Sequence, residues 1–216
     1  MATGPGHDPV RREYGALASK YDRKWAGYVE ATIRETLRRM PLGPGDRILD
    51  VACGTGALLR AVAASAKASD FRVTLAGVDA TPEMLEVANA RIGSSAELKH
   101  ASAESLPFED GAFDTVVTTN ALHFFRQPEN ALREMWRVTK PGGRVVVTDW
   151  CGDFVSCRIC DGVLRVISPA HHRVYDTRGC RELLKDAGFQ SINIERYKIT
   201  WLWGLMTATA SKPKSG

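Results

Sequence analysis

Short apolar runs alternate with longer stretches of helical periodicity through most of the chain. The run at residues 72–79 is almost unbroken, which is typical of a strand buried on both faces of a parallel sheet. The predicted strands are residues 48–50, 72–79, 97–101, 113–119, 144–148, 191–200 and 203–211. The predicted helices are residues 57–68, 82–92, 128–138 and 178–187. Helices that alternate with strands predict an α/β fold.

The first part of the chain has a different pattern. Residues 1–9 hold Gly, Pro and Thr without periodicity and are predicted to be a disordered tail. Residues 10–40 are helical in pattern, and residues 41–45 break the helix. One aromatic stripe consists of Tyr14, Leu17, Tyr21, Trp25 and Tyr28, and a second stripe on a separate predicted helix consists of Val29, Ile33 and Leu37. Core packing is the expected role of most members of the aromatic stripe.

A glycine-containing loop joins the first strand to the following helix. The segment DVACGTG at residues 50–56 has a carboxylate at the strand end and two glycines one residue apart. Glycine lets the backbone approach a ligand closely or adopt a positive φ. The dinucleotide pattern needs a third glycine where this chain has Leu59, and a P-loop needs a Lys-Ser/Thr pair that is absent. The glycines alone would also fit simple packing of a helix on a sheet.

The segment at residues 50–56 resembles motif I of the class I S-adenosylmethionine-dependent methyltransferases. A second match is Gly77-Val78-Asp79 at the end of the second strand, and a third is the Lys-Pro-Gly-Gly turn at residues 140–143. The resemblance implies a Rossmann-like, seven-stranded, mostly parallel sheet with helices on both faces and an antiparallel C-terminal hairpin. It also implies that Asp79 accepts hydrogen bonds from the ribose hydroxyls of S-adenosylmethionine, because one carboxylate has two oxygens for a diol.

Further cofactor contacts are implied by the same resemblance. Residues 102–108 resemble the family's adenine-binding segment, although Ser102 stands at its acidic position and would bind more weakly than a carboxylate. A hydrophobic residue near Met84 covers the adenine in the family, and an N-terminal helix with a Tyr-Asp pair, here Tyr21-Asp22, often forms a lid. The implied cofactor-binding residues are Tyr21, Asp50, Ala52, Gly54, Thr55, Gly56, Asp79, Ala80, Met84, Ser102, Ala103, Glu104 and Asn120.

The methyl acceptor is expected beyond the fourth strand, since ligands bind outside the carboxyl ends of strands in open α/β sheets. His123 follows that strand, and histidine is the residue type that ordinarily serves as a proton acceptor near neutral pH, so it is the candidate general base. DNA adenine methyltransferases carry an Asn/Asp-Pro-Pro-Tyr/Phe motif here, which this chain lacks. Residues 151–175 have no counterpart in the minimal sheet, and the resemblance implies a substrate-specificity insert. The candidate substrate contacts are His123, Trp150, Cys157, Cys160, His171 and His172.

The cysteines and histidines of that insert invite a zinc-binding interpretation. Cys157, Cys160, Leu164 and Ile167 fall at helical spacing, however, so they are predicted to form an apolar helix face and no bound metal is expected. The Trp201-Leu202-Trp203 tip could touch a lipid or hydrophobic substrate, although edge packing is the simpler interpretation.

Length and composition agree with one globular domain over residues 10–216, with residues 10–40 as a helical lid. The formal net charge of +4 comes without a dense Lys/Arg cluster, so no nucleic-acid partner is expected. No apolar run approaches the length of a membrane span, and the polar residues 1–9 are not a signal peptide, so integral membrane association is not expected. Five cysteines without a secretory signal predict reduced thiols and a cytoplasmic location.

The sequence therefore predicts methyl transfer from S-adenosylmethionine to a small, partly hydrophobic molecule. The motifs resemble most the ubiquinone/menaquinone-type C-methyltransferases and their small-molecule relatives, although the chain is shorter than typical quinone enzymes. Two alternatives remain: a regulatory protein that binds the cofactor without catalysis, and a nicotinamide-dependent oxidoreductase with an irregular fingerprint. The oligomeric state and the atom that accepts the methyl group are left open.

Overall fold

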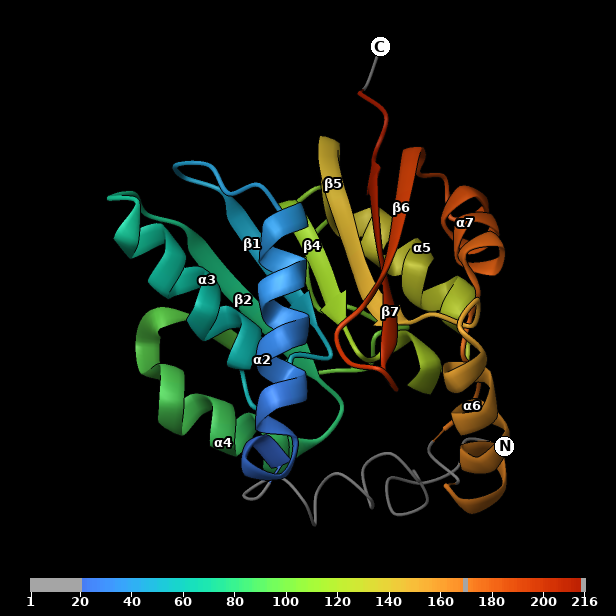
Figure 1. Ribbon diagram of the computed structural model, residues 1–216. Helices are drawn as coiled ribbons and strands as arrows, with labels where there is room; N and C mark the ends of the chain where they lie inside the picture. Colours follow the sequence, from blue (N-terminus) through green and yellow to red (C-terminus); the bar gives the residue numbers. More distant parts are fainter. Residues whose placement is uncertain (1–20, 169–170, 215–216) are drawn as a thin grey trace, which may run out of the picture.

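The computed structural model describes residues 21–168 and 171–214, and their side chains from residue 25 onward (Figure 1). The predicted tail at residues 1–9 and the stripe members Tyr14 and Leu17 lie outside the described residues, as does the side chain of Tyr21. None of the described helices is long and apolar enough to cross a membrane.

The described part contains one seven-stranded sheet, flanked by helices. The strands are β1 (Arg47–Val51), β2 (Thr74–Asp79), β3 (Glu97–His100), β4 (Phe113–Thr119), β5 (Thr139–Trp150), β6 (Gln190–Lys198) and β7 (Gly204–Ser211). The helices are α2 (Tyr21–Arg39), α3 (Ala57–Ala68), α4 (Pro82–Ile92), α5 (Pro128–Val138), α6 (Val155–Ile167) and α7 (Thr177–Asp186), with short 3₁₀ turns η1 (Gly93–Ser95) and η2 (Leu122–Phe124).

The strand order is β3-β2-β1-β4-β5-β7-β6. The first five strands pair in parallel, whereas β7 runs antiparallel to both β5 and β6. Helices α2, α3 and α4 cover one face, and α5 and α7 cover the other (Figure 1). This arrangement confirms the predicted Rossmann-like sheet and its antiparallel C-terminal hairpin.

Two apolar clusters form the core, one on each face of the sheet. Successive side chains of a strand point to opposite faces, so Ile48 packs under α3 while Leu49 packs on the side of α5 and α7. On β4, Val117 and Val116 divide in the same way. Burial on both faces explains why these strands have apolar side chains at successive positions, as at Ile48-Leu49 and Val116-Val117, and not only at alternate ones.

Some local predictions need correction. The described members of the first stripe, Tyr21, Trp25 and Tyr28, lie with the second stripe on one helix, α2, which is kinked at Trp25, where φ is −114° and ψ is 16°. The predicted turn at residues 140–143 lies within β5, beside an irregularity in its pairing with β4. The N-cap of α7 is Asp176 and not Thr177, because the Asp176 carboxylate accepts a hydrogen bond from the Gly179 amide at 2.7 Å. Ile167 is exposed and does not share the inner face of α6 with Cys157.

Candidate functional site

A cavity of about 440 Å³ lies outside the carboxyl ends of β1, β2 and β4, where ligands bind in open α/β folds. Eleven of the predicted cofactor contacts line it: Asp50, Ala52, Gly54, Thr55, Asp79, Ala80, Met84, Ser102, Ala103, Glu104 and Asn120. The other lining residues are Val29, Ile33, Cys53, Ala57, Leu58, Thr81, Ala101, Thr119, Ala121, Phe124, Phe125, Arg126 and Gln127. The structure thus gathers residues that are separated in the chain into one site.

The loop between β1 and α3 forms one wall of the cavity. Ala52 and Gly54 have positive φ angles of 61° and 53°, and Ala52 is in the left-handed region that non-glycine residues rarely adopt. Gly56, also predicted to contact the cofactor, does not line the cavity. A Cβ on Gly56 would lie 2.3 Å from Ile92 Cδ1, and its φ is 75°. Gly56 therefore allows α3 to start close against α4 and acts on the site only through the shape of the loop.

The Asp79 carboxylate holds two loops of the cavity together. Its Oδ2 accepts a hydrogen bond from the Gly54 amide at 2.8 Å, and its Oδ1 accepts one from the Thr81 amide at 2.8 Å. Burial raises the pKa of Asp79, and the two backbone hydrogen bonds counteract that rise. Each carboxylate oxygen can accept a further hydrogen bond. Asp79 can therefore bind a ligand while it keeps the glycine loop in place.

Asp50 is a second buried carboxylate in the wall of the same cavity. It is 1% exposed, and its Oδ1 has no hydrogen-bond partner among the described residues. Burial raises the pKa of Asp50 well above the usual range, and the nearby charge of Asp79 raises it further. An unsatisfied buried carboxylate oxygen is costly. The site is therefore suited to a ligand that brings a positively charged donor to Asp50.

The opposite side of the cavity is formed by the segment after β3 and by α4. Met84 is buried at 3% exposure and gives this side an apolar surface. Ser102 Oγ donates a hydrogen bond to the Glu104 carboxylate, and the Glu104 amide donates to Ser102 Oγ at 3.3 Å. The Glu104 carboxylate therefore lies beside the position where the family has an acidic residue and this chain has a serine.

Asn120 lies at the carboxyl end of β4, with a positive φ of 53°. Its amide donates to the Thr148 carbonyl at 2.8 Å, and its Oδ1 accepts a hydrogen bond from the Tyr28 hydroxyl at 2.7 Å. Trp150 Nε1 donates to the same Tyr28 hydroxyl at 2.5 Å. Trp150 itself does not line the cavity. Tyr28 therefore joins the lining residue Asn120 to the end of β5.

His123 belongs to a separate buried cluster and does not line the cavity, contrary to the predicted position. Its Nδ1 lies 2.6 Å from Asp149 Oδ1, and its amide donates to Asp149 Oδ2 at 3.1 Å. Its ring stacks on Trp150 at a centroid distance of 5.2 Å and lies 5.3 Å from the ring of His171. His171 Nε2 lies 2.8 Å from Asp161 Oδ1, and burial lowers the pKa of His171. The cluster thus consists of two adjacent His–Asp pairs.

The remaining candidate substrate contacts also lie away from the cavity lining. Cys157 is buried, with its Sγ 3.2 Å from the Gly204 carbonyl oxygen, and burial raises the pKa of its thiol. Cys160 is only partly buried. His172 is exposed, and its amide donates to the His123 carbonyl at 3.0 Å. Within the described ranges, no group of three or more His, Cys, Asp or Glu side chains has an arrangement that could hold a metal ion.

Several lining residues were not predicted from the sequence. Val29 and Ile33 of α2 form part of the wall, and Tyr28 holds Asn120 from the same helix. The helical spacing of the aromatic stripe that contains Tyr28 predicts core packing, and spacing alone cannot separate a core face from a cavity wall. Phe124 and Phe125 line the cavity directly after His123. In the sequence, only their position close after the end of β4 indicates that they could line the cavity.

Comparison with known proteins identifies related sequences. Residues 49–147 match the family model described as methyltransferase domain. The chain is 31% identical over 151 residues to the ubiquinone/menaquinone biosynthesis C-methyltransferase of Geotalea daltonii, covering 68% of this chain and 59% of that protein. It is 37% identical over 160 residues to the demethylmenaquinone methyltransferase of Symbiobacterium thermophilum, covering 66% of this chain and 62% of that protein. The chain thus spans about three fifths of the length of these curated relatives.

Solved structures share the fold. A chain from the complex between the Haloferax volcanii Trm112 methyltransferase activator and a putative methyltransferase is similar with a TM-score of 0.80 and 21% identity, covering 93% of this chain and 98% of that one. Haemonchus contortus phosphoethanolamine N-methyltransferase 2, solved with S-adenosyl-L-methionine, is similar with a TM-score of 0.67 and 19% identity. The match covers 84% of this chain and 52% of that one. At these identities the likeness concerns the fold.

Proposed function

Because the chain belongs to the class I S-adenosylmethionine-dependent methyltransferases, we propose that it transfers the cofactor's methyl group to a small, partly hydrophobic acceptor. The observation that carries this proposal is the cavity at the carboxyl ends of β1, β2 and β4, which combines two buried carboxylates with apolar walls. When bound, S-adenosylmethionine supplies a methyl group that is already activated by a sulfonium, so the protein contributes alignment and exclusion of water.

The residues present fit that cofactor. Asp50 would accept hydrogen bonds from the ammonium of the amino-acid part, because its Oδ1 has no partner among the described residues. Asp79 would use its remaining acceptor capacity for the ribose hydroxyls. Met84 and Ala103 would bound the adenine, with the carboxylate of Glu104 at its polar edge. A nicotinamide cofactor would present no ammonium to Asp50, which disfavours the oxidoreductase alternative.

The acceptor would lie beside the segment that follows β4. Phe124 and Phe125 give this part of the cavity an aromatic, largely apolar wall, while Asn120 supplies a polar group that Tyr28 holds in place. The two relatives named above are quinone-type methyltransferases by name. A demethylated quinol is therefore the first acceptor to assay. Residues 10–40 would act as a lid, with α2 forming one wall, and residues 151–175 would select the acceptor.

His123 is proposed as the general base for an acceptor that loses a proton. If His123 Nδ1 donates to Asp149, its Nε2 is left as the proton acceptor, and the imidazole is held in one orientation. Because the ring does not line the cavity, direct proton transfer requires an acceptor that extends toward Trp150. An acceptor methylated without loss of a proton would not need this pair.

The decisive test has two stages. Calorimetric titration of the purified chain should show binding of S-adenosylhomocysteine and much weaker binding of NAD. Asp79→Ala removes a charge-assisted hydrogen-bond acceptor. It should therefore reduce the binding free energy of S-adenosylhomocysteine by about 1.5–3 kcal/mol. Transfer of labelled methyl from S-adenosylmethionine to a demethylated quinol, and to simpler phenols, then identifies the acceptor. Tighter binding of NAD, or binding of the cofactor without transfer to any acceptor, would contradict the proposal.

A further inference from the structure

The outer face of α6 is apolar, although it faces away from the protein. Five of its aliphatic side chains are exposed: Val155 at 68%, Ile159 at 63%, Val163 at 52%, Val166 at 84% and Ile167 at 68%. Four of them recur at spacings of four, four and three residues, which places them on one side of a helix. The inner side of the same helix is already held by the buried Cys157. Isolated exposed aliphatic residues are ordinary, but a contiguous stripe indicates a contact surface.

The exposed charged side chains of this helix are all positive. The other exposed positions of α6 are Arg158, Gly162 and Arg165, so no carboxylate is exposed on it. Its one acidic residue, Asp161, is turned inward, where it pairs with His171 at 2.8 Å and reaches Arg165 at 2.7 Å. The outer face is therefore an aliphatic stripe bordered by arginines.

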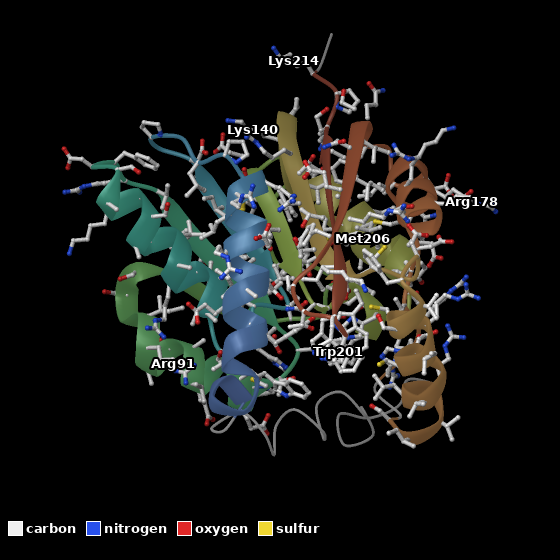
Figure 2. The ribbon with its side chains drawn as sticks, viewed as in Figure 1. Arg91, Lys140, Arg178, Trp201, Met206 and Lys214 are labelled. Carbon is white, nitrogen blue, oxygen red and sulfur yellow. The ribbon has the colours of Figure 1, made fainter. Side chains whose placement is uncertain are left out.

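An exposed aromatic side chain lies at the same end of the molecule. Trp201 lies in the loop between β6 and β7 (Figure 2). Its side chain is 83% exposed. That loop ends at Gly204, which contacts α6 directly, because its carbonyl oxygen lies 3.2 Å from Cys157 Sγ. This end of the molecule is also where β1, β2 and β4 terminate at the cavity (Figure 1).

We propose that the outer face of α6, with Trp201 at the same end of the molecule, docks this protein on the surface of an anionic lipid bilayer. A helix with an aliphatic face and bordering arginines lies in the plane of an interface, where its apolar side chains enter the headgroup boundary. Basic residues are attracted to the negative surface potential of anionic lipids, and tryptophan is enriched at the same depth. The inner face of α6 fixes the stripe on the rigid body of the protein.

The positive charge on α6 favours an anionic bilayer over a second copy of the chain as the partner of this face. A two-fold pairing of α6 helices would bring Arg158 of one copy toward Arg158 of the other, and no exposed carboxylate on the helix balances this charge, since Asp161 already pairs with Arg165. An anionic bilayer supplies that balance over the whole face. The inference goes beyond the proposed function, because the contact requires neither cofactor nor methyl acceptor.

The test is sedimentation of the full chain with vesicles of phosphatidylcholine alone or mixed with phosphatidylglycerol. We expect binding to the mixed vesicles, weakened by added salt because the attraction is screened, and much less binding to phosphatidylcholine alone. Ile159→Gln combined with Val166→Gln keeps the charge and good helix propensity but removes two apolar contacts, so binding should fall at least tenfold. Arg158→Gln should weaken binding about fivefold.

Arg60→Gln is the matched control, because Arg60 is an exposed arginine on α3 and its loss changes the net charge equally. It should leave binding unchanged, and all variants should keep the wild-type melting temperature and affinity for S-adenosylhomocysteine. Equal sedimentation with both kinds of vesicle, or no effect of the α6 substitutions, would overturn the proposal. So would light scattering that shows a dimer which Ile159→Gln/Val166→Gln dissociates, since a second copy would then cover the face.

Discussion

Replacing Asp50 with asparagine should stabilise the ligand-free protein at neutral pH while it weakens cofactor binding. The substitution keeps the size and shape of the side chain and removes its charge. In the folded protein this charge is 1% exposed, its Oδ1 lacks a partner among the described residues, and Asp79 adds a repulsive charge. A carboxylate in this situation is stabilised better in the unfolded chain, where water surrounds it.

The gain should depend on pH in a defined direction. Burial raises the folded-state pKa of Asp50 well above its ordinary value of 3.8, so the folded protein holds a proton that the unfolded chain has already released. The wild type therefore loses stability as pH rises from the unfolded pKa through the folded pKa. The asparagine variant has no such titration. Its advantage should be near zero in acid and reach about 1–3 kcal/mol above the folded pKa, the usual cost of an unsatisfied buried polar group.

Urea denaturation of both proteins across this pH range measures the difference in their free energies of unfolding. In a chain of this length, each kcal/mol of added stability should raise the melting temperature by about 2–4 °C. Titration with S-adenosylhomocysteine should show affinity reduced about tenfold to a hundredfold, because the ligand's ammonium loses a charge-assisted acceptor. Asp186→Asn, at an exposed carboxylate on α7, should change neither quantity. A lower stability of Asp50→Asn at neutral pH, or a difference that does not vary with pH, would show that the carboxylate is already satisfied.

Three further substitutions test other parts of the site. Asp79→Asn should destabilise the protein by about 1.5–3 kcal/mol in urea denaturation, because an amide cannot accept from both backbone N–H groups; a gain would contradict the tethering role. Gly56→Ala should cost about 1–3 kcal/mol, since the new Cβ meets Ile92 Cδ1 at 2.3 Å and φ is 75°, whereas Gly162→Ala, with open space around it, should cost nothing by thermal melt. His123→Ala should slow turnover without changing affinity for S-adenosylhomocysteine; unchanged turnover with every acceptor would make this residue structural.

The order of elements and the main binding loops were predictable from local patterns. Buried parallel strands have apolar runs, and the run that ends at Asp79 is recognisable for that reason. The loop after β1 needs glycine where φ is positive, so Gly54 and Gly56 mark it. Local patterns were less informative where two conformations compete. The Lys-Pro-Gly-Gly segment has turn residues throughout, yet pairing with β4 draws it into β5.

The individual contacts of the site residues could not be predicted from local patterns. Both loop glycines match the same motif, but Gly54 lines the cavity and Gly56 faces Ile92 of α4. Tyr28 belongs to an aromatic stripe that predicts core packing, but its hydroxyl holds Asn120. A motif gives the residue type and the position along the chain. The neighbour that each side chain meets depends on how the helices pack.

The sequence by itself predicted the α/β class and the strand ends at which polar residues gather, because both follow from periodicity within one segment, and the resemblance of short motifs to a known family predicted the cofactor. Only the tertiary structure decided which of those residues meet. Strand order and register place Asp50 beside Asp79 on one cavity and pair His123 with Asp149 outside it. The packing of α6 on β7 likewise decides which of its two apolar faces is buried. These are contacts between distant segments, and the side chains on either side of them carry no local signal of their partners.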